Sequence, residues 1–306
     1  LNRLHLAVAQ IQRDRLRAPQ HDLEWRHIAG RAQEAMGLVG GPIDRLVVGN
    51  RQIVRPQFDL RFGQQIDQRG RLRLKAVRVA IGDDGDRPHV KRDDLVIASK
   101  CYFPMGPQPN QFGLSRKHIM ASCEASLKRL RTDYLDLYYL HGPDPITPYE
   151  ETLRAMDDLV RQGKVRYLGC SNLFGWQVAK AAGVAARMGL EPLKAGQYIY
   201  SLIHRELERE LVPALVDHGI GLTAYSPLGA GLLTGKYKGM RDPAPGTRHF
   251  FRTQVDGPRF WNAQGFRIAE ILEQTALESG IPMARLAIGW PLARKFVSAV
   301  IIGVRG

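Results

Sequence analysis

The chain has 306 residues and a formal net charge of +14, with 44% hydrophobic and 24% charged residues. This length fits one α/β barrel, and the composition is ordinary for a folded globular protein. Three scattered cysteines argue against a disulfide framework or a zinc site, so we expect no metal and a reducing, cytoplasmic setting. The short apolar runs argue against a membrane-spanning helix or a signal peptide, so we expect no membrane partner.

The first 91 residues differ in composition from the rest of the chain. Residues 1–90 contain 15 arginines, nine glutamines, one lysine and no tyrosine, whereas all ten tyrosines lie from Tyr102 onward. The short apolar runs 46–48 and 77–81 are candidate strands, but no helical or strand period continues for long. We interpret residues 1–91 as an atypical arginine-rich segment. One hypothesis is that it is an out-of-frame translation joined to the true frame near Lys91.

The arginines of this segment are scattered. No aromatic residues alternate with them, and no helix-turn-helix spacing is present. We therefore expect no nucleic-acid partner, although a net charge of +14 would permit one.

From Lys91 onward, apolar runs alternate with helical patterns. The runs predict strands at 95–98, 135–140, 165–169, 195–200, 220–225 and 297–302. The patterns between them predict helices at 116–130, 148–160, 176–188, 206–218, 266–279 and 283–294, with a long loop at 226–262. Six strands alternating with helices predict an α/β fold of βαβ units, which build either an open sheet or a closed barrel.

Several residues mark where these helices begin or bend. Ser115 is a predicted N-cap, and Thr147 is expected to cap a helix whose first turn holds Pro148. Pro291 lies inside a helical pattern and is expected to kink it.

Functional groups of such barrels lie at the carboxyl ends of the strands. Taken singly, each polar residue found there can be explained without a function. A single lysine is mostly a solvated surface charge, and a single histidine mostly forms hydrogen bonds within a loop. Together they could form one pocket for a carbonyl and a flat ring, since a cation and an imidazole suit a carbonyl and amide side chains suit a carboxamide. The residues at these ends are Lys100, His141, Ser171, Asn172, Gln197, Tyr225 and Arg305.

Three long motifs carry a specific resemblance. The runs YLDLYYLHGPDPITPYEETLRAMDDLVRQGKVRYLGCSN, YSPLGAGLLTGKY and SAVIIGVRG closely resemble the aldo-keto reductase family, in the branch with potassium channel β subunits and general-stress oxidoreductases. The resemblance covers residues 92–306 and implies a (β/α)8 barrel of the TIM type. Only six βα units are recognisable, so we interpret this range as a truncated barrel domain of that family. It implies NADP(H) binding without a Rossmann fold, and hydride transfer to a small-molecule aldehyde or ketone with a tyrosine as proton donor.

The resemblance also implies roles for individual residues. Lys100 matches the lysine that lowers the tyrosine pKa, and His141 matches the histidine that orients the carbonyl. The cofactor-binding positions are Ser171, Asn172 and Gln197 for the carboxamide, Tyr225 for stacking, Ser226, Pro227, Leu228, Gly229, Gly231, Leu232 and Lys236 over the pyrophosphate, and Gly303 and Arg305 at the adenosine phosphate.

Two expected motifs are absent from this sequence. The family has an Asp-Thr-Ala motif followed by Tyr-Gly before the position of Lys91, and it continues past Arg305 with a helix that completes the adenine site. Because the Asp and the Tyr of the catalytic set are missing, we expect an impaired oxidoreductase. The alternative is a non-catalytic nucleotide-binding or regulatory subunit. The carbonyl substrate, the choice between NADP and NAD, and a homo-oligomeric state stay open.

Overall fold

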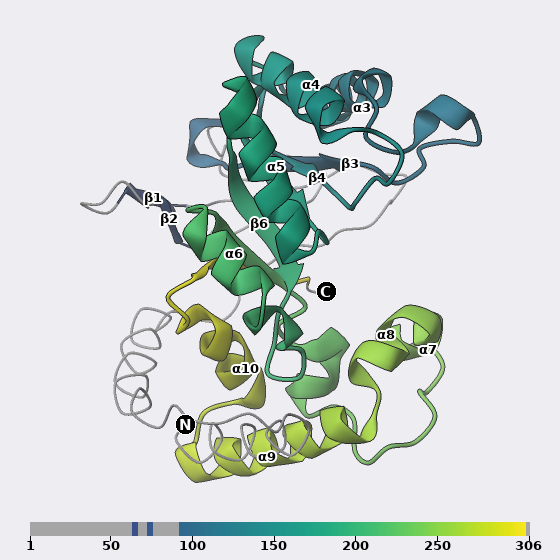
Figure 1. Cartoon of the computed structure of the whole chain (residues 1–306). Helices are drawn as coiled ribbons and strands as arrows, with labels where there is room; N and C mark the ends of the chain where they lie inside the picture. Colours follow the sequence, from purple (N-terminus) through teal and green to yellow (C-terminus); the bar gives the residue numbers. More distant parts are fainter. Residues whose placement is uncertain (1–62, 67–71, 76–91, 304–306) are drawn as a thin grey trace. The chain divides into compact units, whose positions relative to one another are not determined.

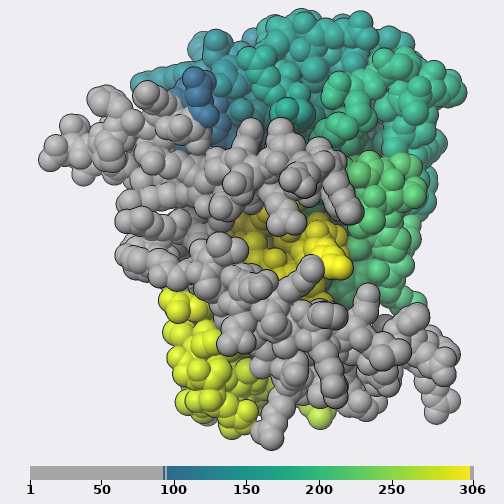
Figure 2. Space-filling view, turned by 90° about the vertical axis from the view of Figure 1, so that its left-hand side faces the viewer, coloured from purple at the N-terminus to yellow at the C-terminus, as the bar shows by residue number. Residues whose placement is uncertain are grey.

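The computed structural model describes residues 63–66, 72–75 and 92–303, which are coloured in Figures 1 and 2. In the first two ranges, β1 (Gly63–Ile66) and β2 (Leu72–Lys75) form an antiparallel pair. The candidate strands 46–48 and 77–81 and the residue Arg305 lie outside the described residues.

Six strands form one sheet in the order β3-β4-β5-β6-β7-β8, so each strand pairs with its neighbour in the sequence. The pairs from β3 to β6 are parallel, with Lys100 opposite Tyr139 and Ser171 opposite Gln197. This sheet confirms the predicted α/β class and fits the (β/α)8 barrel. The bounds are β3 Ala98–Cys101, β4 Leu135–Leu140, β5 Val165–Ser171, β6 Leu193–Ile199, β7 Gly221–Tyr225 and β8 Val297–Ile301.

The chain divides into two compact units. The described residues 92–198 and 207–223 belong to one, here called the β3–β6 unit, and residues 199–206 and 224–302 belong to the other, the β8 unit. Helices of the first are η2 Arg92–Asp94, η3 Pro109–Gln111, α3 Arg116–Leu130, α4 Tyr149–Arg161, α5 Gly175–Met188 and α6 Leu211–Asp217. Those of the second are η5 Gly229–Thr234, α7 Arg248–Phe251, α8 Thr253–Phe260, α9 Ala263–Ser279 and α10 Met283–Leu292, and η4 Glu206–Glu208 lies at a boundary between the units.

The core of the β3–β6 unit lies between the strands and a layer of helices. Helices α3, α4 and α5 lie side by side, and α3 packs on β3 as α4 packs on β5 (Figure 1). Helix α4 carries an apolar stripe of Leu153, Met156 and Leu159, which are fully buried, and Val160, which is half-buried. Full burial of one such side chain contributes roughly 1.5–3 kcal/mol, so this stripe is a main attachment of α4.

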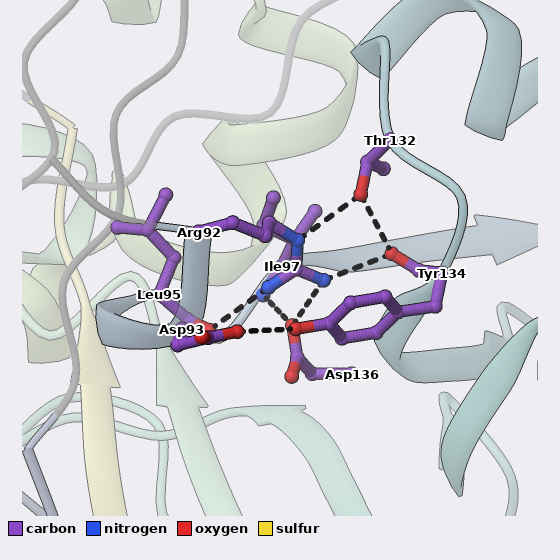
Figure 3. A network of polar contacts seen from close by, with 7 residues as sticks. All are labelled: Arg92, Asp93, Leu95, Ile97, Thr132, Tyr134 and Asp136. Atoms are coloured by element: carbon purple, nitrogen blue, oxygen red, sulfur yellow. Dashed lines mark hydrogen bonds and ion pairs between the residues drawn. The ribbon is translucent and has the colours of Figure 1, made fainter. Parts of the chain in front are cut away.

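The first strand begins later than predicted, at Ala98 instead of residue 95. The carboxylate of Asp136 accepts the N–H of Ile97 at 2.7 Å and pairs with the Arg92 guanidinium at 2.8 Å (Figure 3). A side-chain carboxylate thus accepts the N–H of the residue just before β3, and β3 begins three residues later than predicted. The strand also continues to Cys101, so Lys100 lies within it and not beyond its end. Strand β5 likewise continues past the predicted residue 169 to Ser171.

The predicted helix caps are right at one position and wrong at another. Ser115 caps α3, because its hydroxyl oxygen accepts the N–H of His118. The Thr147 prediction is wrong: α4 begins at Tyr149, and the Thr147 hydroxyl donates to Asp144 at 2.8 Å. Pro148 is the N-cap residue of α4, and no side chain caps the helix there.

The predicted helix 206–218 is broken into η4 and α6. Pro213 has no N–H to donate to the carbonyl of Arg209, and its ring would clash with that carbonyl, so the helix can start only shortly before the proline. Pro291 lies inside α10, which stops at Leu292, short of the predicted residue 294.

The predicted loop 226–262 is also wrong, since it contains η5, α7 and α8. Thr247 caps α7 by accepting the N–H of Phe250, a start signal that the short length of α7 hides from periodicity analysis. No helix among the described residues is both long enough and apolar enough to cross a membrane.

Candidate active site

Four adjacent parallel strands bring five of the predicted site residues to one edge of the β3–β6 unit. Lys100 lies on β3, His141 follows the last residue of β4, Ser171 ends β5 with Asn172 next to it, and Gln197 lies on β6. Because the carboxyl ends of parallel strands share an edge, these groups face the same region.

A row of hydrogen bonds links three of these strands. The Nδ2 of Asn172 donates to the carbonyl of His141 at 2.8 Å and to the hydroxyl oxygen of Ser171 at 2.9 Å. The Ser171 hydroxyl donates to the carbonyl of Gln197 at 2.6 Å. Asn172 has a φ of 60°, a left-handed conformation that asparagine tolerates better than most residues. The row fixes the Asn172 amide beside two strand ends.

The Lys100 ammonium is largely buried. Burial lowers the pKa of its ammonium to about 8. Its Nζ lies 5.9 Å from the ring centroid of Tyr139, a distance at which the aromatic face still attracts a cation. The side chain therefore stays charged at neutral pH but gives up its proton far more easily than a surface lysine.

His141 is neutral at physiological pH. Burial lowers the pKa of its imidazole to about 4, and the charge of Lys100 acts in the same direction. A neutral imidazole carries one N–H donor and one acceptor nitrogen, so it can donate a hydrogen bond to a carbonyl oxygen.

Tyr139 lies beneath this site and was not singled out from the sequence. Its side chain is buried, and its hydroxyl is hydrogen-bonded to the side chains of Thr223 and Gln197. The ring fits because Gly169 on β5 has no side chain: an added Cβ would lie 2.5 Å from the ring. Burial raises the pKa of this phenol well above its ordinary value. Tyr139 thus anchors the Gln197 amide, and only the strand register could have revealed this.

The predicted residues from Tyr225 to Lys236 belong to the β8 unit. Tyr225 ends β7, is half-buried, and accepts the N–H of Tyr200 through its carbonyl at 3.2 Å. The chain then passes through Ser226, Pro227, Leu228 and η5. Positive φ angles occur at Ser226 (58°), Gly229 (55°), Ala230 (56°), Gly231 (100°) and Gly235 (82°).

The N–H groups of Gly229, Gly231 and Leu233 donate to the carbonyls of Ser226 and Leu228, so this segment is a series of tight turns. Lys236 lies over it, since its Nζ is 2.9 Å from the point where a Cβ on Gly231 would be. Leu232 and Pro227 are buried and support the loop from below. Gly303 follows β8 and is exposed, and Arg305 lies outside the described residues.

Other chemistry is scarce in the part of the chain that the structure describes. Among these residues no group of three or more His, Cys, Asp or Glu side chains could hold a metal ion. Cys101, Cys123 and Cys170 are free thiols, each of them buried.

Comparison with known proteins gives one family. The model of the aldo/keto reductase family matches residues 74–306. A probable voltage-gated potassium channel subunit beta from Arabidopsis thaliana is 40% identical over 214 residues, covering 70% of this chain and 65% of that protein. The uncharacterized oxidoreductase YrpG of Bacillus subtilis is 37% identical, with 70% and 64% covered. The L-glyceraldehyde 3-phosphate reductase of Escherichia coli K12 is 34% identical, with 69% and 62% covered. The chain thus spans a little under two thirds of the length of these relatives.

Proposed function

Because the chain belongs to the aldo/keto reductase family, we propose that residues 92–306 form most of an NADP(H)-dependent oxidoreductase that transfers hydride between nicotinamide and an aldehyde or ketone. The observation that carries the proposal is the row of Lys100, His141, Ser171, Asn172 and Gln197 along four neighbouring strand ends. The family's oxidoreductase chemistry requires a carbonyl site and a carboxamide site side by side, and this row offers both kinds of group.

The residues present fit a nicotinamide nucleotide. A carboxamide needs both donors and acceptors, which the Asn172 and Gln197 amides and the Ser171 hydroxyl carry. The Lys236 ammonium beside η5 supplies the positive charge that a phosphate requires. When bound, the nicotinamide would supply or accept the hydride.

The side chains of this protein would act on the carbonyl itself. The neutral imidazole of His141 would donate a hydrogen bond to the carbonyl oxygen and fix its direction. The Lys100 ammonium, charged below a pH of about 8, would stabilise negative charge that develops on the oxygen. Tyr139 would hold Gln197 in place, so the carboxamide site needs little reorganisation on binding.

We propose that carbonyl reduction by this chain is slow, because residues 1–101 contain no tyrosine and no Asp-Thr-Ala motif. The second candidate is a non-catalytic nucleotide-binding or regulatory subunit. The potassium channel subunit among its relatives favours that candidate. Both candidates require the nucleotide site, and turnover separates them. A cytoplasmic setting is part of the proposal, supported by three free thiols.

NADPH is expected to raise the melting temperature of the full chain, since a ligand that binds only the folded state stabilises it. Lys236→Met should weaken NADPH binding roughly 10-fold, because a hydrogen bond to a charged group contributes about 1.5–3 kcal/mol and solvent reduces it here. The matched control is Lys238→Met, which removes the same charge from an exposed side chain paired with Glu273. It should change the Kd less than about 2-fold.

NADPH fluorescence measures the Kd of the wild type and of both variants, and thermal unfolding measures the rise in melting temperature. The same titrations with NADH measure how much the 2′-phosphate contributes to binding. No melting shift at millimolar NADPH, or equal effects of the two lysine variants, would count against the proposed nucleotide site.

A further inference from the structure

The chain around Lys236 is held by a cluster of aromatic side chains. Helices α7, α8 and α9 all pack against η5. The ring of His249, on α7, has its centroid 4.4 Å from that of Trp261 and 5.5 Å from that of Tyr237. The Tyr237 and Trp261 rings also meet each other edge to face at 4.9 Å. Because Tyr237 directly follows Lys236, this cluster supports the lysine of the proposed phosphate site.

The imidazole at the centre of this cluster is an unusual choice of side chain. His249 is completely buried, and neither of its ring nitrogens has a hydrogen-bond partner within the described part of the chain. The hydroxyl of Tyr237 beside it is buried in the same way. Buried polar atoms without partners destabilise a fold, and an apolar ring of similar shape would avoid that loss. Packing alone therefore does not account for a histidine at this position.

The surroundings of His249 favour the neutral imidazole. Burial lowers the pKa of the ring, and the charges of Arg248 and Lys236 act in the same direction. The carboxylate of Asp256 and the backbone of Gly229 act in the opposite direction. Asp256 is itself buried and already pairs with two arginines, at 2.8 and 3.2 Å, so little of its charge remains for a third cation.

Protonation of His249 would disrupt the cluster. A charged imidazole carries two N–H donors, and keeping such a charge out of water is costly unless it is paired and hydrogen-bonded. The protonated ring would gain free energy by leaving its place between Tyr237 and Trp261. Lys236 would then lose its support, and a nucleotide would have to restore the packed arrangement as it binds, which lowers the apparent affinity.

We propose that His249 is a positioning residue, which holds Lys236 at the phosphate site only while its imidazole is neutral. The proposal rests on the proposed function, because it takes Lys236 as a ligand of the nucleotide phosphates. It makes nucleotide binding sensitive to acid through a side chain that is buried away from solvent.

Acid is expected to weaken NADPH binding in a defined pH range. The pKa of the His249 imidazole is lowered in the packed cluster, whereas an exposed imidazole has the ordinary value of about 6.5. Above that pH both forms are neutral, and His249 leaves the Kd unchanged. Below it the exposed form takes up a proton, so the Kd rises by up to about 10-fold per pH unit until the lowered pKa is reached.

The test measures the Kd for NADPH by fluorescence between about pH 7.5 and 5.5 in the full chain and in His249→Phe, which keeps a ring in the cluster but cannot titrate. The 2′-phosphate of NADPH also titrates, near pH 6, and contributes equally in both proteins. The rise in Kd should be at least about 3-fold larger in the wild type, with the two Kd values within about 2-fold at the upper pH. The matched control, His218→Phe, replaces an exposed histidine at the end of α6 and should keep the wild-type profile.

An NMR titration of the His249 ring, identified by the loss of its signal in His249→Gln, gives a second readout. Linkage is reciprocal, so NADPH should lower the His249 pKa, whereas a histidine with a merely structural role would titrate equally with and without NADPH. Identical pH profiles for the wild type and His249→Phe, or a His249 pKa that NADPH leaves unchanged, would overturn the proposal. Failure of the proposed function is separate, because it appears as the absence of any NADPH-dependent melting shift at about pH 7.5.

Discussion

Turnover of a reactive aromatic aldehyde by the full chain is expected to run roughly 10²–10⁴-fold below the ordinary enzyme range of about 1–10³ s⁻¹. General acid catalysis contributes that factor, and the family's tyrosine donor has no counterpart in residues 1–101. Lys100 and His141 would still bind and polarise the carbonyl. NADPH oxidation measured at saturating aldehyde gives the rate, and turnover at ordinary rates would show that a donor is present.

Two tyrosines near Lys100 could be thought to replace the donor. Tyr139 is unsuited, because it is buried and its hydroxyl is already hydrogen-bonded to Thr223 and Gln197. Tyr102 lies two residues after Lys100, and its ring is held against Gly142. The residual rate should therefore survive Tyr102→Phe and should rise with the concentration of an added buffer acid. A loss of the residual rate in Tyr102→Phe would identify Tyr102 as the donor.

Gly169→Ala is expected to lower the free energy of unfolding by about 3 kcal/mol, the upper part of the range for overpacking a core. An added Cβ would lie 2.5 Å from the Tyr139 ring and 2.8 Å from the carbonyl oxygen of Ala195. One of these is a packed ring and the other is strand backbone, so neither can move cheaply. A displaced Tyr139 would also release Gln197, and NADPH binding should weaken with stability.

The matched control is Gly183→Ala in the middle of α5. No atom lies within 4 Å of an added Cβ there, so the change should stabilise the protein by roughly 0.5–1 kcal/mol through helix propensity. Urea denaturation of both variants measures the difference. Equal stabilities would mean that Gly169 does not meet Tyr139 as closely as the structure shows.

The alternation of apolar runs is enough to predict the six strands of the main sheet, because parallel strands buried on both faces leave a clear signal in the sequence. Their order follows from the resemblance to a barrel family and not from the alternation. Strand β4 is predicted with its observed bounds, 135–140. The start of β3 is missed, since it depends on a hydrogen bond from Ile97 to the distant side chain of Asp136. Helices α7 and α8 are missed because neither is long enough to show a period.

The candidate site, like the fold, is predicted from the sequence only in part. The strand-end rule points to Lys100, His141 and Asn172 from sequence alone. The role of Tyr139 in holding the Gln197 side chain could not be predicted. It depends on the strand register, which places Tyr139 opposite Lys100, and on the space that Gly169 leaves for the ring.

An NMR titration of the His141 imidazole in the wild-type chain and in Lys100→Met tests most directly whether the two side chains face one cavity. In the wild type the imidazole should stay neutral down to a pH of about 4, because burial and the Lys100 charge both disfavour its protonated form. Removing the charge should raise the His141 pKa while burial keeps it below the ordinary value of about 6.5. An imidazole that titrates near 6.5 in both proteins would mean that the two strand ends do not share a site.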